Sequence, residues 1–136
     1  MALQLSTTVR NARVNAIETA IGASAVLKIR TTTPPANCAA ADAGSVLATL
    51  NLPSDWMAAA ASGAKAKGAG AWEDTSADAA GTAGHFRIYA SDGTTCHMQG
   101  TVSATGGGGD LVVDNAVFAA GQSFSIVSFS LTDGNA

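Results

Sequence analysis

The stretch "HFRIYASDGTTCHMQGTV", residues 85–102, decides the fold class of this chain. Apolar and polar residues alternate on both sides of "SDG", whose residue types tolerate a tight reversal of the backbone. Such alternation around a turn predicts a β-hairpin. The alternating apolar residues are Phe86, Ile88, Cys96, Met98 and Val102.

The same two-residue period continues outward from the hairpin in both directions and predicts strands over most of the chain. It appears in "AVLKIRT" (25–31), "SVLATLNLP" (45–53), "DLVVDNAVFA" (110–119) and "GQSFSIVSFSLT" (121–132). In the last stretch the apolar parity shifts near Val127, which predicts a bulge there. About six to eight short strands separated by turn residues predict an antiparallel β-sandwich, jelly-roll-like or immunoglobulin-like.

The connections between these strands contain residues that interrupt regular structure. Pro34 and Pro35 end the first predicted strand, because each lacks a backbone donor. Residues 53–63 are predicted to form a short helix or a turn, or to continue into a strand. The Ala-, Gly- and Lys-rich tract 64–71 is predicted to be a flexible loop before Trp72.

One segment has a helical period instead. In "TTVRNARVNAIETAI", residues 7–21, apolar residues recur at three- and four-residue steps, which predicts an amphipathic helix. Ser6 or Thr7 can cap its start, and Gly22 can cap its end. The apolar stripe must cover either the core of this domain or a surface of a neighbour. It consists of Val9, Ala12, Ala16, Ile17, Ala20 and Ile21.

The composition favours a protein that works by assembly. Of the 136 residues, 47% are hydrophobic and only 12% are charged, about half the usual charged fraction. Residues 1–68 hold six basic and three acidic side chains (+3), whereas residues 69–136 hold one basic and seven acidic side chains (−6). This asymmetry suits contacts between charged surfaces of neighbouring subunits. The absence of a basic stripe argues against nucleic acid as a partner.

Two further classes are not expected. The first residues lack the basic and apolar regions of a secretory signal, and no apolar run approaches the length of a membrane span. We therefore expect synthesis in the cytoplasm and no membrane as a partner.

The reactive side chains form no recognisable catalytic or metal-binding pattern. Cys96 and His97 are adjacent, so on a strand they point to opposite faces and cannot bind one ion together. His85 and His97 are predicted to be exposed on the outer face of the hairpin. The "GGGG" at 106–109 lacks the lysine and helix of a phosphate-binding loop, and no G-x-S-x-G motif is present. We predict no enzymatic activity, no metal and no cofactor.

The two cysteines and the two tryptophans each allow two interpretations. Cys38 and Cys96 either form a disulfide across the hairpin or remain small buried thiols. Trp56 and Trp72 either lie in the core or form part of a sugar-binding platform, and the core is favoured because the chain has few aromatic residues.

The chain resembles a group of small virion-associated proteins that tailed phages and prophages encode beside their structural genes. The likeness is carried by "MALQLSTTVRNARVNAIETAIG", "AVLKIRT", "NLPSDWMAAA", "GTAGHFRIYASDGTTCHMQGTV" and the ending "TDGNA", and it covers nearly the whole chain. The resemblance implies a place on the virion and supplies no catalytic residues.

In that setting the physical features favour a capsid decoration, or cement, protein on the outer capsid surface. Its expected partners are the major capsid protein and further copies of itself, as a dimer or a trimer. Residues 1–23 are predicted to be an arm and helix that make the contacts, and residues 24–136 to be the β-sandwich domain. The predicted contact residues are Leu3, Leu5, Val9, Arg10, Arg13, Ile17 and Ile21. The alternative is a tail or fibre component whose β domain binds a host surface glycan.

Overall fold

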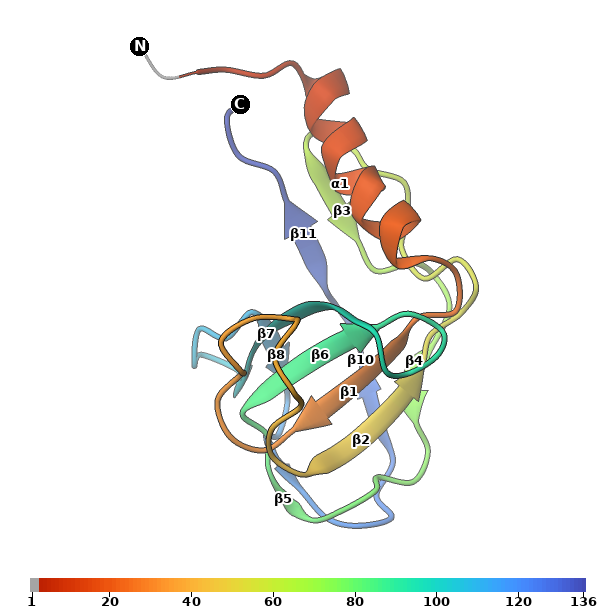
Figure 1. Cartoon of the computed structure of the whole chain (residues 1–136), viewed down its shortest axis with the longest axis vertical. Coiled ribbons are helices and arrows are strands. Elements are labelled where there is room, and N and C mark those ends of the chain that lie inside the picture. Colours follow the sequence, from red (N-terminus) through yellow and green to blue (C-terminus); the bar gives the residue numbers. More distant parts are fainter. Residues whose placement is uncertain (1–2) are drawn as a thin grey trace.

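The computed structural model describes residues 3–136, which form one helix followed by strands (Figure 1). The chain is mostly β, and the predicted class, an antiparallel β-sandwich-like fold preceded by a helix, is confirmed. The elements are α1 (Thr7–Ile21), β1 (Val26–Arg30), β2 (Val46–Asn51), β3 (Ala64–Ala66), β4 (Trp72–Asp74), β5 (Gly81–Thr82), β6 (His85–Tyr89), β7 (Cys96–Ala104), β8 (Leu111–Val113), β9 (Val117–Phe118), β10 (Phe124–Ile126) and β11 (Ser130–Thr132).

The helix α1 begins and ends at the predicted residues. The Val9 N–H donates to Ser6 Oγ at 3.3 Å, so Ser6 is the N-cap. At the other end the Gly22 N–H donates to Glu18 O at 2.8 Å. Both caps satisfy backbone groups that a helix terminus leaves unpaired.

The main sheet has five strands in the order β2-β1-β6-β7-β8. β1 pairs antiparallel with β2 and β6, and β6 pairs antiparallel with β7, which confirms the hairpin. One face of β1 and β6 carries Leu27, Ile29, Phe86 and Ile88, which belong to the apolar core. The opposite face is also covered, because the long connection between β1 and β2 folds over it (Figure 1).

The pairing of β7 with β8 is parallel, an exception to the predicted antiparallel sheet. Parallel neighbours usually need a connection of a dozen or more residues, yet only residues 105–110 link these two strands. A Cβ at Gly107 or Gly109 would lie 2.7 Å from atoms of Ser103. The glycine-rich loop therefore turns back tightly enough for β8 to run alongside β7.

A second layer closes the core behind the sheet. It contains the two-stranded ribbons β4–β10 and β5–β9, and Figure 1 shows β4 and β10 behind β1 and β6. The Trp72 ring lies 5.9 Å from the Trp56 ring and 5.6 Å from the Phe129 ring, measured between centroids. Both tryptophans are almost fully inaccessible, so the core interpretation of these residues is confirmed.

The ribbon β3–β11 and helix α1 form an extension beyond the sheet, and the C-terminal segment lies beside them (Figure 1). Of the three alternatives for residues 53–63, the structure shows bends, a turn and isolated bridges and no helix. Two other local expectations were wrong. Part of the tract predicted to be a flexible loop forms β3. The last predicted strand is two strands, because β10 pairs with β4 and β11 pairs with β3. Between β10 and β11 the chain passes from one ribbon to the other. Val127 lies in this connection and is 80% exposed instead of forming a bulge.

Candidate functional site

Helix α1 is attached to the body through its polar side. Three polar side chains spaced three or four residues apart accept hydrogen bonds from the backbone of residues 57–63. The bonds run from the Gly63 N–H to Asn11 Oδ1 (2.8 Å), from the Ala60 N–H to Asn15 Oδ1 (3.2 Å) and from the Met57 N–H to Glu18 Oε1 (3.0 Å). The helix thus supplies acceptors to a segment that lacks a regular strand partner.

A buried lysine strengthens this attachment. Lys65 of β3 is only 4% exposed, and its Nζ lies 2.9 Å from Glu18 Oε2 and 2.8 Å from Asn15 Oδ1. A buried ammonium group is costly unless it is paired and hydrogen-bonded, and both conditions are met here. The ion pair fixes the position of α1 on β3.

Two helix arginines bind the C-terminal segment of the same chain. Arg10 Nη2 donates to Asp133 O at 2.8 Å and Arg10 Nε to Gly134 O at 3.1 Å. Arg13 forms an ion pair with the Asp133 carboxylate at 3.2 Å. The positive N-terminal end therefore meets acidic and carbonyl groups of its own chain, which reduces the charge available to a neighbour.

The face of α1 opposite these contacts is apolar and exposed. We call Val9, Ala12, Ala16 and Ala20 the outer α1 face; all four side chains are exposed. These residues recur at three- and four-residue steps and form one stripe along the helix. Of the predicted stripe only Ile17 and Ile21 turn inward, and Val14, outside that stripe, is buried. The outer α1 face therefore does not cover the core of its own domain.

The predicted contact residues fall into two groups. Leu3, Val9 and Arg13 are exposed. Leu5, Arg10, Ile17 and Ile21 are partly or fully buried in their own chain. Leu5 also donates its N–H to Asn135 O at 2.7 Å. The surface left for a partner is therefore the outer α1 face together with Leu3, and the alanines were missed as site residues although they belonged to the predicted stripe.

The two histidines do not share an exposed face, so that prediction was wrong. His85 is fully buried and its Nδ1 lies 2.9 Å from Thr32 O in the β1–β2 connection. His97 is exposed at an irregularity of the hairpin, because Tyr89 pairs with Cys96 and Ile88 with Met98. Across residues 3–136 no group of three His, Cys, Asp or Glu side chains is arranged to hold a metal ion.

The β1–β2 connection is held down by Arg87. The guanidinium is 1% exposed, forms an ion pair with Asp42 and donates to three backbone carbonyls of the connection. The carbonyl acceptors are Asn37 (3.1 Å), Cys38 (3.0 Å) and Ala40 (3.2 Å). Arg30 binds the second Asp42 oxygen at 2.8 Å. The buried charge is thus matched by an acid and by fixed dipoles.

Asp42 also accepts a hydrogen bond from Tyr89 at 2.7 Å. Burial disfavours the Asp42 carboxylate, but the hydrogen bonds from Tyr89 and Arg87 and the charge of Arg30 outweigh it and lower the pKa of Asp42. Burial and the bond to Asp42 raise the pKa of Tyr89 to about 12. The cluster has structural partners for each of its charged groups.

Cys38 and Cys96 are both free thiols and both half-buried. They line one hollow of about 570 Å³ together with Asp42 and Arg87. Burial raises the pKa of the Cys96 thiol to about 11, and the neighbouring Cys38 thiol adds to the shift. The two thiols therefore border the same hollow, and their oxidation to a disulfide stays a prediction.

No known protein family, curated protein or solved structure matches this chain. Among residues 3–136 no helix is both long and apolar enough to cross a membrane. The outer α1 face and the exposed Leu3 are thus assigned as the candidate site on geometry alone.

Proposed function

We propose that this protein is a structural component of a tailed-phage virion that decorates the capsid and bridges neighbouring capsid subunits as a homo-oligomer. The observation that carries the proposal is the orientation of α1. The side chains on its polar side are hydrogen-bonded to the backbone of residues 57–63, and its outer face exposes Val9 and three alanines to solvent. An apolar face on a helix of a soluble domain is stabilised when a partner covers it.

The helix is suited to this role because it is already ordered. The buried Glu18–Lys65 pair and the backbone bonds to Asn11 and Asn15 hold it in place before any partner arrives. A preformed contact element loses little conformational entropy on binding. Alanine side chains also allow a second backbone to approach closely.

Each such contact is small, and many copies would make the total large. Multivalent attachment raises avidity without new contacts, provided that the geometry permits simultaneous binding. On a capsid the added contacts would raise the barrier to rupture under the pressure of packaged DNA. The resemblance to virion-associated proteins supports this setting.

The alternative, a tail or fibre component that binds a glycan, gains no support from the aromatic residues. All seven Phe, Trp and Tyr side chains lie in residues 3–136, and all are buried. A sugar-stacking platform of exposed rings is therefore not available in the described chain. Copy number separates the two roles, since decoration requires hundreds of copies per particle and a tail component requires a handful.

The test is binding of the purified protein to expanded or emptied capsids that lack it, measured by co-sedimentation and quantitative gel analysis. We expect saturation at hundreds of copies and a loss of affinity of at least about tenfold for Ala16→Glu. The matched control is Ala120→Glu, which places the same side chain at an exposed alanine in the β9–β10 turn. No binding by the wild-type protein, or equal binding by both variants, would overturn the proposal.

A further inference from the structure

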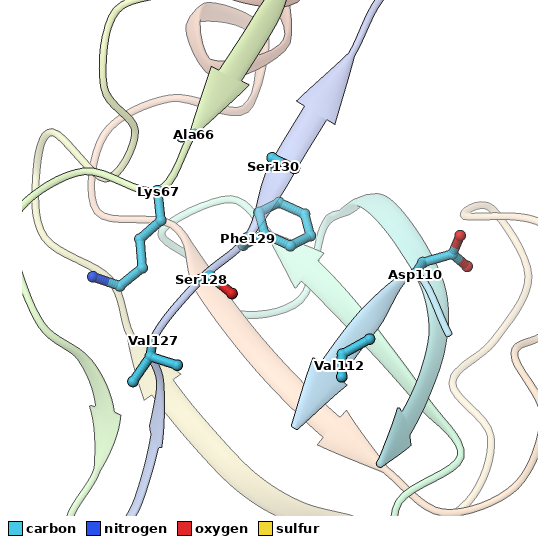
Figure 2. A pocket seen from close by; sticks show the side chains of 8 residues that line it. All are labelled: Ala66, Lys67, Asp110, Val112, Val127, Ser128, Phe129 and Ser130. Carbon is cyan, nitrogen blue, oxygen red and sulfur yellow. The ribbon is translucent and has the colours of Figure 1, made fainter. Parts of the chain in front are cut away.

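A groove runs beside the segment that connects β10 to β11. Its first part, about 380 Å³, lies between Val127 and Ser128 on one side and Asp110 and Val112 on the other, with Phe129 between them (Figure 2). A second hollow of about 290 Å³ continues past Leu131 and Thr132. The two hollows share Asp110, Phe129 and Ser130, so they form one groove along residues 127–132.

One wall of the groove is an open strand edge. The Lys67 N–H donates to Phe129 O, and the Asp133 N–H donates to Gly63 O, each at 2.8 Å. Residues 129, 131 and 133 therefore turn their backbone groups toward β3. In an antiparallel pair the intervening residues point the other way, so the N–H and C=O of Ser130 and Thr132 face away from β3.

The opposite wall is a second open edge. β8 is the last strand of the five-stranded sheet and pairs only with β7 among the described strands. Six residues of extended chain span about 20 Å, so the groove accommodates one short strand. Unpaired strand edges bind extended segments by adding them to the sheet, with main-chain hydrogen bonds giving the affinity.

The N-terminal segment Leu3–Ser6 has the properties of the missing strand. It is uncharged and alternates Leu3 and Leu5 with Gln4 and Ser6, a strand-like period. Leu3 is 74% exposed. The groove is also neutral overall, because its rim carries one cation, Lys67, and one anion, Asp110. Inserting the segment would therefore bury no unmatched charge of its own.

We infer that Leu3–Ser6 of one copy inserts into this groove of a second copy. On insertion the segment exchanges two bonds within its own chain, from the Leu5 N–H to Asn135 O and from the Gln4 amide to Ala136 O, for main-chain bonds to the groove. The segment cannot fill the groove of its own chain, because it lies beside Asn135 at the far end of α1, away from β8 (Figure 1). Val112 and Val127, two of the few exposed large apolar side chains, border the groove. One contact thus covers both the exposed leucine and the exposed valines.

Such an interface joins two different surfaces, so it is heterologous and closes into a ring when the rotation between subunits permits. The inference rests on the proposed function, since it names the partner in the self-association. It uses the N-terminal segment and the groove, whereas capsid binding uses the outer α1 face. An experiment can therefore refute either proposal without refuting the other.

The experiment is sedimentation velocity of the full purified chain at roughly 100 µM, well above micromolar dissociation constants. Wild type is expected to self-associate, and Leu3→Asp and Val127→Asp are each expected to be monomeric. An equimolar mixture of the two variants has one intact segment and one intact groove, so it is expected to form a one-to-one dimer. Both substituted side chains are largely exposed, and circular dichroism verifies that the variants fold.

The control variants are Val117→Asp, at a 59% exposed valine of β9, and Ala120→Glu, at an exposed alanine of the β9–β10 turn. Both are expected to associate like wild type. In the associated state the amide protons of Ser130 and Thr132 should exchange more slowly with deuterium. A monomeric wild type, a mixture of Leu3→Asp and Val127→Asp that stays monomeric, or association without this protection would overturn the inference.

Discussion

Arg87 shows how one buried side chain determines what a surface can do. Its alternation with Phe86 and Ile88 predicted the correct face of β6 but not its burial. The two terminal nitrogens of the guanidinium donate to the carbonyls of Asn37, Cys38 and Ala40 and to the Asp42 carboxylate. The face of β6 that carries Arg87 was expected to be exposed to solvent, but the protein's own β1–β2 connection covers it.

Tyr89 gives a direct measurement of this cluster, because it is the only tyrosine in the chain. Burial and its bond to Asp42 favour the neutral phenol, so phenolate absorbance at alkaline pH should appear with a midpoint of about 12. Since the unfolded pKa is 10.0, the stabilising contribution is complete below pH 10.0 and is lost as the pH rises toward 12. Asp42→Asn is expected to lower the midpoint. A midpoint near 10.0 in folded protein would contradict the assignment.

At the scale of elements, the sequence predicted the position of α1 but not its orientation. Capping residues and period are local properties, and they located the ends at Thr7 and Ile21. The orientation depends on the surface beneath the helix, where unpaired N–H groups and Lys65 require acceptors. Polar residues therefore turned inward, against the rule that the apolar stripe packs on the core.

The hairpin was also predictable from a local property, the alternation of its residues. Its register and the burial of its side chains were not predictable. Alternation in residues 85–102 is local, but the irregularity near Tyr89 changed which of Cys96 and His97 faces the β1–β2 connection. The burial of His85 depends on that connection, which has no period from which a position can be derived. The sequence therefore indicated that residues 1–23 would make the contacts. Which of their side chains are exposed depends on how α1 packs on the rest of the chain.

Glu18 tests the attachment of α1. Glu18→Ala leaves buried Lys65 without its carboxylate, so we expect the free energy of unfolding in urea to fall by about 3 kcal/mol. Thr19→Ala is the matched control at an exposed position of the same helix. A loss for Glu18→Ala below about 1 kcal/mol, the range of exposed ion pairs, would show that the pair does not fix the helix.

Oxidation of Cys38 and Cys96 tests the position of the β1–β2 connection over the hairpin. Oxidised glutathione should accept the two electrons and two protons of the Cys38 and Cys96 thiols, giving one protein disulfide and two molecules of reduced glutathione. Closing a long loop should raise the melting temperature, with a stabilisation of about 2–4 kcal/mol. Cys38→Ser should show no such rise. Formation of glutathione adducts on both cysteines instead of the bond would contradict the proximity.

At the scale of the whole molecule, acidic side chains fasten three separate loops. Asp42 binds the β1–β2 connection to β6 through Arg87. Asp92 accepts hydrogen bonds from Thr94 and Thr95 in the hairpin loop. Asp110, at the end of the glycine-rich loop, accepts a hydrogen bond from Thr101 of β7. The pKa of each of these carboxyls is lowered, for Asp92 and Asp110 mainly by hydrogen bonds and for Asp42 despite its burial. Loop order therefore depends on ionised carboxylates.

Acid should loosen the molecule accordingly. A depressed folded pKa contributes stability above the unfolded value, 3.8, and this stability is lost as the pH falls through the folded pKa. We expect the urea midpoint to fall steeply below about pH 4, and Asp42→Asn to be less stable at pH 7 with a shallower fall. Asp55→Asn, at an exposed aspartate, should follow wild type. A urea midpoint independent of pH would refute this account.

The adjacency of Leu5 and Asn135 has a topological consequence. Because the Leu5 N–H reaches Asn135 O at 2.7 Å, a few glycines suffice to ligate the described ends into a circle. Reopening that circle at the exposed Ala120–Gly121 turn should give a circularly permuted protein with the parental circular dichroism spectrum. Failure to fold would indicate that the order in which the elements are synthesised matters. Success would place new termini at the opposite pole, where cargo can be appended without touching α1.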